Sequence, residues 1–348
     1  MRLNTLPRVR LANTPTPLQP LPNLTRHLKG PRILVKRDDL TGLAFGGNKA
    51  RKLEYLMGDA LKNNADIIVT GAGFHSNWCT QTAAAARKLG LPVILVKSGP
   101  EDGYEPPTWD GNHLLHHLLG ADITILKEGS GQRRQEITQE LRKQGRNPYT
   151  MPVGGSNPIG AAGYVNCMLE LLGQSVEQGV KITHLYHATG SGGTQTGLAL
   201  GAKALNTGIK VVGVTTGFGD VDRTTERLLN LSNETADFLE IDTRITADDI
   251  NVLTQYGMGY GYATDAKMEA IKLTAETEGL LIDPVYTAPA MAALIDDARN
   301  GRLTNDDTAV FLHTGGTAAL FPYRDPLMAH TRGEPLPWKI PQWSTDYT

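Results

Sequence analysis

The sequence predicts an α/β protein in which parallel sheets are flanked by helices. Short β-branched runs alternate with helical segments of about ten to fifteen residues, the pattern typical of strand–helix–strand units. The alternation restarts after the turn-rich stretch 154–158, Gly-Gly-Ser-Asn-Pro, which indicates a second sheet. A chain of 348 residues is long enough for two domains.

The elements follow in order along the chain. The runs at 66–70 and 92–96 are rich in Ile and Val and predict strands, and 77–89 is rich in alanine and predicts the helix between them. The same alternation predicts the remaining strands at 123–126, 148–152, 183–188, 210–215 and 308–312. The remaining helices are predicted at 111–119, 132–144, 159–173, 195–205, 222–237, 264–278 and 288–299. The proline-rich opening is expected to be an extended arm and not a secretory signal.

Composition excludes several classes of function. A net charge of −2 argues against a dedicated nucleic-acid binder, whose surface should be basic. The longest apolar runs, such as 92–96, are far too short to span a membrane. Cys79 and Cys167 are the only cysteines, so neither a disulfide framework nor a cysteine metal cluster is expected. We therefore expect a cytoplasmic protein.

The loop at 187–197, His-Ala-Thr-Gly-Ser-Gly-Gly-Thr-Gln-Thr-Gly, is the first candidate site. It follows a predicted strand and opens a predicted helix, where ligands of parallel sheets bind. Glycines allow close backbone approach, and free amides at a helix N-terminus attract anions. The loop lacks the Gly-Lys-Ser/Thr of a Walker sequence and the glycine spacing of a dinucleotide site. We therefore favour a single-phosphate site over a plain flexible turn.

Lys49 is the second candidate, because it stands behind Gly46-Gly47 at the entry to a helix. A lysine near a positive helix end deprotonates readily and can attack a carbonyl. The alternative is a solvated lysine like Lys52. Pyridoxal phosphate needs one phosphate site, one Schiff-base lysine and a partner for its ring nitrogen, so it accounts for both features. The loop 71–76 begins like a nicotinamide site, but Ser76 replaces the third glycine, which argues against that cofactor.

Six motifs occur in a characteristic order: Lys36-Arg-Asp-Asp, Gly46-Gly-Asn-Lys-x-Arg-Lys-Leu-Glu54, Ser76-Asn77, Ala188 to Gln195, Asp283-Pro-Val-Tyr286 and Leu312-His-Thr-Gly-Gly316. Over nearly its whole length the chain resembles the D-cysteine desulfhydrase and 1-aminocyclopropane-1-carboxylate deaminase family. Segments 163–167 and 184–195 are most similar to L-cysteate sulfo-lyases. The resemblance implies a tryptophan-synthase-β-like fold (fold type II), with the cofactor between a small inserted domain, 53–158, and a large domain, 1–52 plus 159–348. It also implies a homodimer.

The resemblance assigns a role to each candidate residue. Lys49 would bind pyridoxal phosphate covalently and later move protons. Asn77 would bond the ring hydroxyl, Thr314 would face the ring nitrogen, and Ser76 would contact the substrate carboxylate or a transferring proton. Tyr260 and Tyr286 would face the substrate. The phosphate would be held by Thr189, Gly190, Ser191, Gly192, Gly193 and Thr194, and the other substrate contacts would be His75, Trp78, Gln81 and Thr287.

The resemblance leaves the substrate open. Thr287 stands where the deaminases carry a glutamate, and a neutral hydroxyl favours elimination of a leaving group over cyclopropane opening. The expected reaction is α,β-elimination from a β-substituted alanine such as D-cysteine or L-cysteate, giving pyruvate and ammonia. His75, Trp78 and Thr80 depart from the family pattern, which suggests a bulkier or less anionic substrate. Ring opening, racemisation and cofactor binding without turnover remain alternatives.

Two further groups are interpreted as structural. His113, His116 and His117 could form a helical metal site, but no acidic partner is near in sequence, so we expect an exposed helix face and no metal. Asp38 and Asp39 are expected to fix the end of a strand at Lys36 and Arg37, and not to act as an acid pair.

Overall fold

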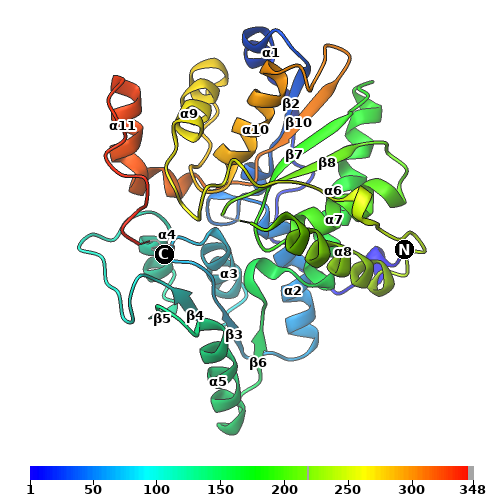
Figure 1. Ribbon diagram of the computed structural model, residues 1–348. Helices are drawn as coiled ribbons and strands as arrows, with labels where there is room; N and C mark the ends of the chain where they lie inside the picture. The colour runs from blue at the N-terminus through cyan, green and yellow to red at the C-terminus, as the bar shows by residue number, and fades with distance from the viewer. Residues whose placement is uncertain (218, 344–348) are drawn as a thin grey trace.

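The computed structural model describes residues 1–217 and 219–343 and contains two separate sheets. The larger has the strand order β1-β2-β10-β7-β8-β9, and the smaller has the order β5-β4-β3-β6. Apart from the antiparallel β1–β2 pair, all the neighbouring strands are parallel. Figure 1 shows the smaller sheet in the lower part of the molecule and the larger sheet above it. The predicted fold class is therefore confirmed.

The smaller sheet is formed by β3 (Ile67–Thr70), β4 (Val93–Ser98), β5 (Asp122–Leu126) and β6 (Pro148–Thr150). Its helices are α3 (Asn77–Lys88), α4 (Gly111–Leu118) and α5 (Ser130–Lys143), and α2 (Lys49–Lys62) precedes it. Because successive side chains of a strand point to opposite faces of the sheet, each face packs into a separate hydrophobic core. Ile68, Val93 and Leu95 pack with α2 and α3, whereas Val69 and Val96 pack against Ile137 of α5.

The larger sheet is formed by β1 (Leu18–Pro20), β2 (Arg32–Lys36), β7 (His184–Thr189), β8 (Lys210–Thr215), β9 (Asn251–Leu253) and β10 (Thr308–Leu312). Its helices are α1 (Pro22–Leu28), α6 (Pro158–Glu177), α7 (Gly193–Ala204), α8 (Val221–Phe238), α9 (Asp265–Glu278), α10 (Thr287–Arg299) and α11 (Arg324–Arg332). Leu185 and Val310 face α6 and α7, while Tyr186 and Phe311 face α9 and α10. Helices thus cover both faces of the sheet (Figure 1).

All strands of the smaller sheet fall within residues 67–150, and those of the larger sheet fall outside that range. The domain boundaries at 53 and 158 stay a prediction. The opening arm lies along α2, where Glu54 accepts hydrogen bonds from the backbone of Leu11 and Ala12. Within the described ranges, no helix is both long and apolar enough to cross a bilayer.

Candidate active site

A cavity of about 210 Å³ lies where the carboxyl ends of strands from both sheets meet the start of α2. Its lining residues follow β3 in the smaller sheet and β7, β8 and β10 in the larger one. This is the place where parallel sheets present their loops to ligands. The cavity brings together most of the predicted site residues: Lys49, Ser76, Asn77, Trp78, Thr189, Gly190, Ser191, Gly192, Thr194, Tyr260, Tyr286 and Thr314.

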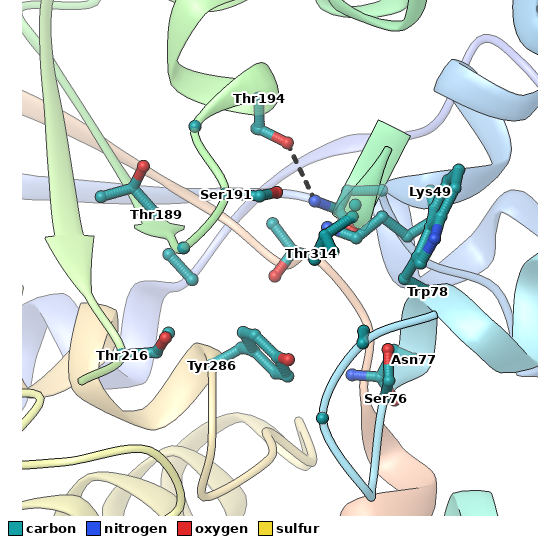
Figure 2. Close-up of a pocket in the computed structure, with 18 of the residues that line it drawn as sticks. Lys49, Ser76, Asn77, Trp78, Thr189, Ser191, Thr194, Thr216, Tyr286 and Thr314 are labelled. Carbon is teal, nitrogen blue, oxygen red and sulfur yellow. Dashed lines mark hydrogen bonds between the residues drawn. The ribbon is translucent and has the colours of Figure 1, made fainter. Parts of the chain in front are cut away.

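Lys49 is the first residue of α2 and lines the cavity. Figure 2 shows its side chain beside that of Trp78. Burial lowers the pKa of the Lys49 amine to about 8, because an ammonium ion loses hydration in this position. The neutral amine is therefore a minority form near physiological pH, but a far larger one than for an exposed lysine. The neutral form is the nucleophile that covalent attachment to an aldehyde requires.

The loop between β7 and α7 presents its amides to the cavity. Arg227 of α8 donates hydrogen bonds to the carbonyl oxygens of Gly190 and Ser191 from outside the loop. Because a trans peptide places its N–H opposite its C=O, the amides of Ser191 and Gly192 face away from Arg227. The side-chain NH₂ group of Asn48 donates a hydrogen bond to Thr194 Oγ1 at 3.0 Å, which is the dashed line in Figure 2. Free amides at the start of a helix suit a phosphate.

Gly192 shows why this loop needs glycine. Its φ is +100°, and a Cβ there would lie 2.9 Å from both Arg227 Nη1 and Leu228 Cδ2. Either the strain or the contact would shift the loop. Gly193, by contrast, begins α7 and does not line the cavity, and its amide donates to Ser156 Oγ at 3.0 Å.

Ser76 and Asn77 form the opposite wall, at the start of α3. Ser76 is the N-cap residue, and its Oγ accepts a hydrogen bond from the Cys79 amide at 3.3 Å. Asn77 Oδ1 accepts from the Asn112 side chain of α4 at 2.7 Å, which leaves the Asn77 NH₂ group as the free donor. Figure 2 shows both side chains across the cavity from Thr189 and Ser191.

A tyrosine pair closes a third side of the cavity. The hydroxyls of Tyr260 and Tyr286 lie 3.1 Å apart, and burial raises the pKa of both. Both phenols therefore stay protonated, and one hydroxyl donates to the other. Tyr286 is held by Asp283, whose carboxylate accepts hydrogen bonds from the Val285, Tyr286 and Thr287 amides.

Three predicted substrate contacts lie away from the cavity. Thr287 is buried and donates to the Asp283 carboxylate at 2.6 Å. Gln81 bonds the Gly46 carbonyl, and the His75 ring packs against Phe74 and Trp343. Trp78 lines the cavity, but its indole N–H is taken by Thr70. Substrate binding by Thr287, Gln81 and His75 stays a prediction that this geometry does not support.

Several lining residues were missed by sequence reasoning. The sequence suggests a solvated lysine at Lys52, but the side chain is 1% exposed, lines the cavity, and donates to the Gly154 carbonyl at 3.0 Å. Its position three residues after Lys49, on the same helix face, was the available signal. Asn48 and Thr216 also line the cavity. Asn48 adjoins Lys49 in the quoted motif, whereas nothing in the sequence marked Thr216.

The histidines of α4 do not form an exposed face as predicted. His113 and His116 are buried, because the helix turns them toward Phe74 and the Ser76 carbonyl. The two aspartates do have structural roles. Asp38 forms a buried ion pair with Arg51, and Asp39 pairs with Arg37. Burial also raises the pKa of Cys79 to about 11, so its thiol is not activated.

The cavity residues fit pyridoxal phosphate. Thr189 Oγ1 is buried and has no hydrogen-bond partner among the described residues, as expected for a group that awaits a ligand. The cavity also holds one lysine at a helix start, an amide-rich loop and, near the end of β10, the hydroxyl residue Thr314. These groups match the amine, the phosphate site and the ring partner that this cofactor requires.

Comparisons with known proteins point to the same cofactor. A family model described as "Pyridoxal-phosphate dependent enzyme" matches residues 9–315. The chain belongs to this family. A D-cysteine desulfhydrase of Klebsiella pneumoniae is 41% identical over 325 residues, which cover 92% of this chain and 97% of the relative. A Pyrococcus horikoshii protein named "Putative 1-aminocyclopropane-1-carboxylate deaminase" is 41% identical over 329 residues, which cover 93% of this chain and 96% of the relative.

A solved structure of an ACC deaminase homologue superposes with a TM-score of 0.86 at 39% identity and covers 94% of this chain and 97% of its own. A threonine deaminase from T.th. shares the fold, with a TM-score of 0.61 at 23% identity over 86% of this chain and 92% of its own. The predicted family, fold type, cofactor and class of enzyme, a pyridoxal-phosphate-dependent lyase, are thereby confirmed.

Proposed function

We propose that this enzyme removes the β-substituent from a small β-substituted alanine, with D-cysteine as the preferred substrate. Its products would be pyruvate, ammonia and hydrogen sulfide. The observation that carries the proposal is the protonated Tyr260–Tyr286 pair, which shares one cavity with the Lys49 amine. Such an arrangement supplies a base for the Cα proton and a separate acid for the leaving sulfur.

Each side chain in the cavity would have its own role in the reaction. Pyridoxal phosphate, when bound, supplies the electron sink that makes the Cα hydrogen of an amino acid acidic. Lys49 would take that proton at Nζ. As the carbon–sulfur bond breaks, the sulfur leaves with the electron pair and takes a proton from the tyrosine hydroxyls. Ser76 and the Asn77 NH₂ group would orient the substrate and the cofactor.

The residues that line the cavity also favour one leaving group over another. No arginine lines this cavity in the described parts of the chain, and guanidinium is the group best suited to hold a sulfonate. Thiol elimination therefore suits the site better than loss of sulfite from L-cysteate. The departures at His75 and Thr80 carry little weight for specificity, because neither residue lines the cavity and Thr80 bonds Asn112.

The absence of a carboxylate from the cavity lining, as far as the chain is described, supports elimination over ring opening. Asp283 is buried nearby, but its oxygens are occupied by the amides at the start of α10 and by Thr287. The ring nitrogen would then face the neutral Thr314. The names of the relatives include both activities, so ring opening is the second candidate.

Steady-state kinetics with five compounds tests the proposal: D-cysteine, L-cysteine, L-cysteate, β-chloro-D-alanine and 1-aminocyclopropane-1-carboxylate. Pyruvate, sulfide, sulfite and α-ketobutyrate are measured separately. We expect kcat/KM for D-cysteine to exceed that for L-cysteate by about tenfold or more, within the ordinary enzyme range of roughly 10⁴–10⁸ M⁻¹s⁻¹. Faster turnover of L-cysteate, or α-ketobutyrate as the main product, would overturn it.

We also propose that the enzyme is a cytoplasmic homodimer. Cys79 and Cys167 are both free and buried, which suits a reducing compartment. Phe45 and Phe321 are 70% and 63% exposed, and large apolar side chains of this kind are commonly covered in oligomers. Light scattering after size-exclusion chromatography measures the mass, and a monomer at micromolar concentration would contradict the dimer.

A further inference from the structure

Glu105, His113 and His117 form a cluster of ligand-type atoms outside the active site. His113 and His117 are four residues apart in α4, so both rings lie on one helix face. Glu105 reaches them from the loop that follows β4. One ligand atom from each residue lies within 4.8 Å of the other two, and His113 Nε2 is 3.8 Å from Glu105 Oε1.

Two imidazole nitrogens of this cluster are buried without a partner. The Nε2 atoms of His113 and His117 accept and donate no hydrogen bond among the described residues, although His113 is only 1% exposed. A buried imidazole nitrogen normally has a partner, so such a pair calls for an explanation. Glu105 is 56% exposed at its side chain and gives the cluster access to solvent.

Each of the three side chains is oriented by a neighbour. His113 Nδ1 lies 2.9 Å from Lys97 Nζ, which leaves Nε2 as the outward nitrogen. Trp109 donates its indole N–H to the Glu105 carboxylate and stacks on the His117 ring, with the ring centres 3.8 Å apart. Metal-binding side chains are characteristically held by such outer contacts.

We propose that Glu105, His113 and His117 bind a divalent transition metal of the zinc type. Two imidazole nitrogens and one carboxylate oxygen are a ligand set that Zn²⁺ favours, and three protein ligands leave the fourth position for water. Bonds of about 2.0–2.1 Å in a tetrahedron place ligand atoms roughly 3.3–3.5 Å apart, close to the 3.8 Å that separates His113 Nε2 from Glu105 Oε1. Nε2 of His113 would bind the metal, while its Nδ1 stays beside Lys97 Nζ at 2.9 Å.

The role of this metal is to fix a loop. None of the three ligands lines the active-site cavity, so the metal does not touch the substrate. It joins the loop of Glu105 to α4, and Asn112 of that helix holds Asn77 at 2.7 Å. The proposal is therefore independent of the choice of substrate, and its test needs no activity assay.

Zinc binding to tag-free holoenzyme is measured by competition with a chromophoric chelator, and Co²⁺ binding by the visible bands of tetrahedral cobalt. The variants are His117→Gln and Glu105→Gln. The matched controls are His27→Gln, an exposed histidine on α1, and Glu101→Gln, an exposed glutamate of the same loop. We expect one Zn²⁺ per chain with a micromolar or lower Kd, at least tenfold weaker in either variant and unchanged in the controls.

Thermal unfolding provides a second readout. Zn²⁺ at about 100 times its Kd should raise the Tm of the native holoenzyme by roughly 3–4 °C for a chain of this size, and that shift should disappear in His117→Gln. Near-UV circular dichroism confirms that the variants fold. No Zn²⁺ binding below millimolar concentration, or binding that persists unchanged in the Glu105→Gln/His117→Gln double variant, would overturn the proposal.

Discussion

Lys49 and Lys52 lie one turn apart on the same helix, but their surroundings give them different roles. The Lys52 amino group donates a hydrogen bond to the Gly154 carbonyl, whereas Lys49 begins the helix and lies beside Trp78 in the cavity. We predict that Lys49→Ala loses covalently bound cofactor and lowers kcat by roughly 10²–10⁴-fold or more, because no proton carrier replaces the amine. Lys52→Ala is the matched control and should keep the covalent band. Absorbance before and after borohydride measures both, and a reducible band in Lys49→Ala would refute the assignment.

The pKa of Lys49 predicts a pH dependence for cofactor capture. Burial lowers that pKa to about 8, and only the neutral amine attacks an aldehyde. Below pH 8 most of the amine is protonated, so the rate at which apo-enzyme captures pyridoxal phosphate should rise with pH. It should reach half its maximum near pH 8. Stopped-flow absorbance from pH 6 to 10 measures this rate, and a midpoint near the ordinary lysine value of about 10.4 would contradict the prediction.

At the scale of elements, α2 is anchored by a buried ion network two residues beyond Lys49. Arg51 donates to Asp38, which follows β2, and to Glu170 of α6. Lys36 of β2 also pairs with Glu170. The neighbouring Arg51 and Lys36 charges hold the pKa of Asp38 below its usual range despite burial. The network thus ties a strand and two helices together next to Lys49.

Removal of Arg51 should therefore destabilise the fold strongly. We predict that Arg51→Leu lowers the free energy of unfolding by roughly 3–5 kcal/mol, since it leaves the buried Asp38 charge without its main partner. Arg133→Leu on α5 removes the ion pairs of an exposed arginine and should cost about 1 kcal/mol or less. Urea unfolding followed by circular dichroism compares the two, and equal costs would show that the network adds little.

The sequence predicted elements well where glycine or proline interrupts a clear pattern. The predicted helix 288–299 and strand 308–312 agree with α10 and β10 to within a residue. Short or polar elements were missed. β1 and β9 have only three residues each, and α1 and α11 have only seven and nine. Such elements form because neighbouring strands and helices hold them, and a local window does not contain that information.

At the scale of the whole molecule, the sequence predicts those parts of the cavity lining that a single short segment forms. The loop after β7 and Lys49, which were predicted to form one site, both line the cavity, because backbone geometry and helix position are local properties. The burial of Lys52, the packing of His75 against Trp343 and the capture of Thr287 by Asp283 depend on how distant elements pack, so they were not found. Glu105 and His113 are likewise brought together by a loop that folds back on α4.

Trp343 connects the parts of the molecule that carry the two sheets. Its ring lies 4.6 Å from that of His75, which follows β3. On the side of the larger sheet it lies 5.8 Å from Tyr323 and 6.3 Å from Tyr260, which lines the cavity. The indole is 8% exposed, so its removal opens a cavity between these groups. A change at this one side chain should therefore affect both stability and the site.

We predict that Trp343→Ala lowers the free energy of unfolding by roughly 3–5 kcal/mol, the usual cost of truncating a buried aromatic side chain. It should also reduce kcat/KM more than cofactor affinity, because Tyr260 loses a neighbour while Lys49 and the phosphate loop are untouched. Trp338→Ala is the control, since that ring packs on Tyr323 but lies beside neither His75 nor Tyr260. Thermal unfolding, cofactor titration and steady-state kinetics of both variants separate these effects. If both variants lose kcat/KM equally, the contact of Trp343 with Tyr260 does not position the tyrosine pair.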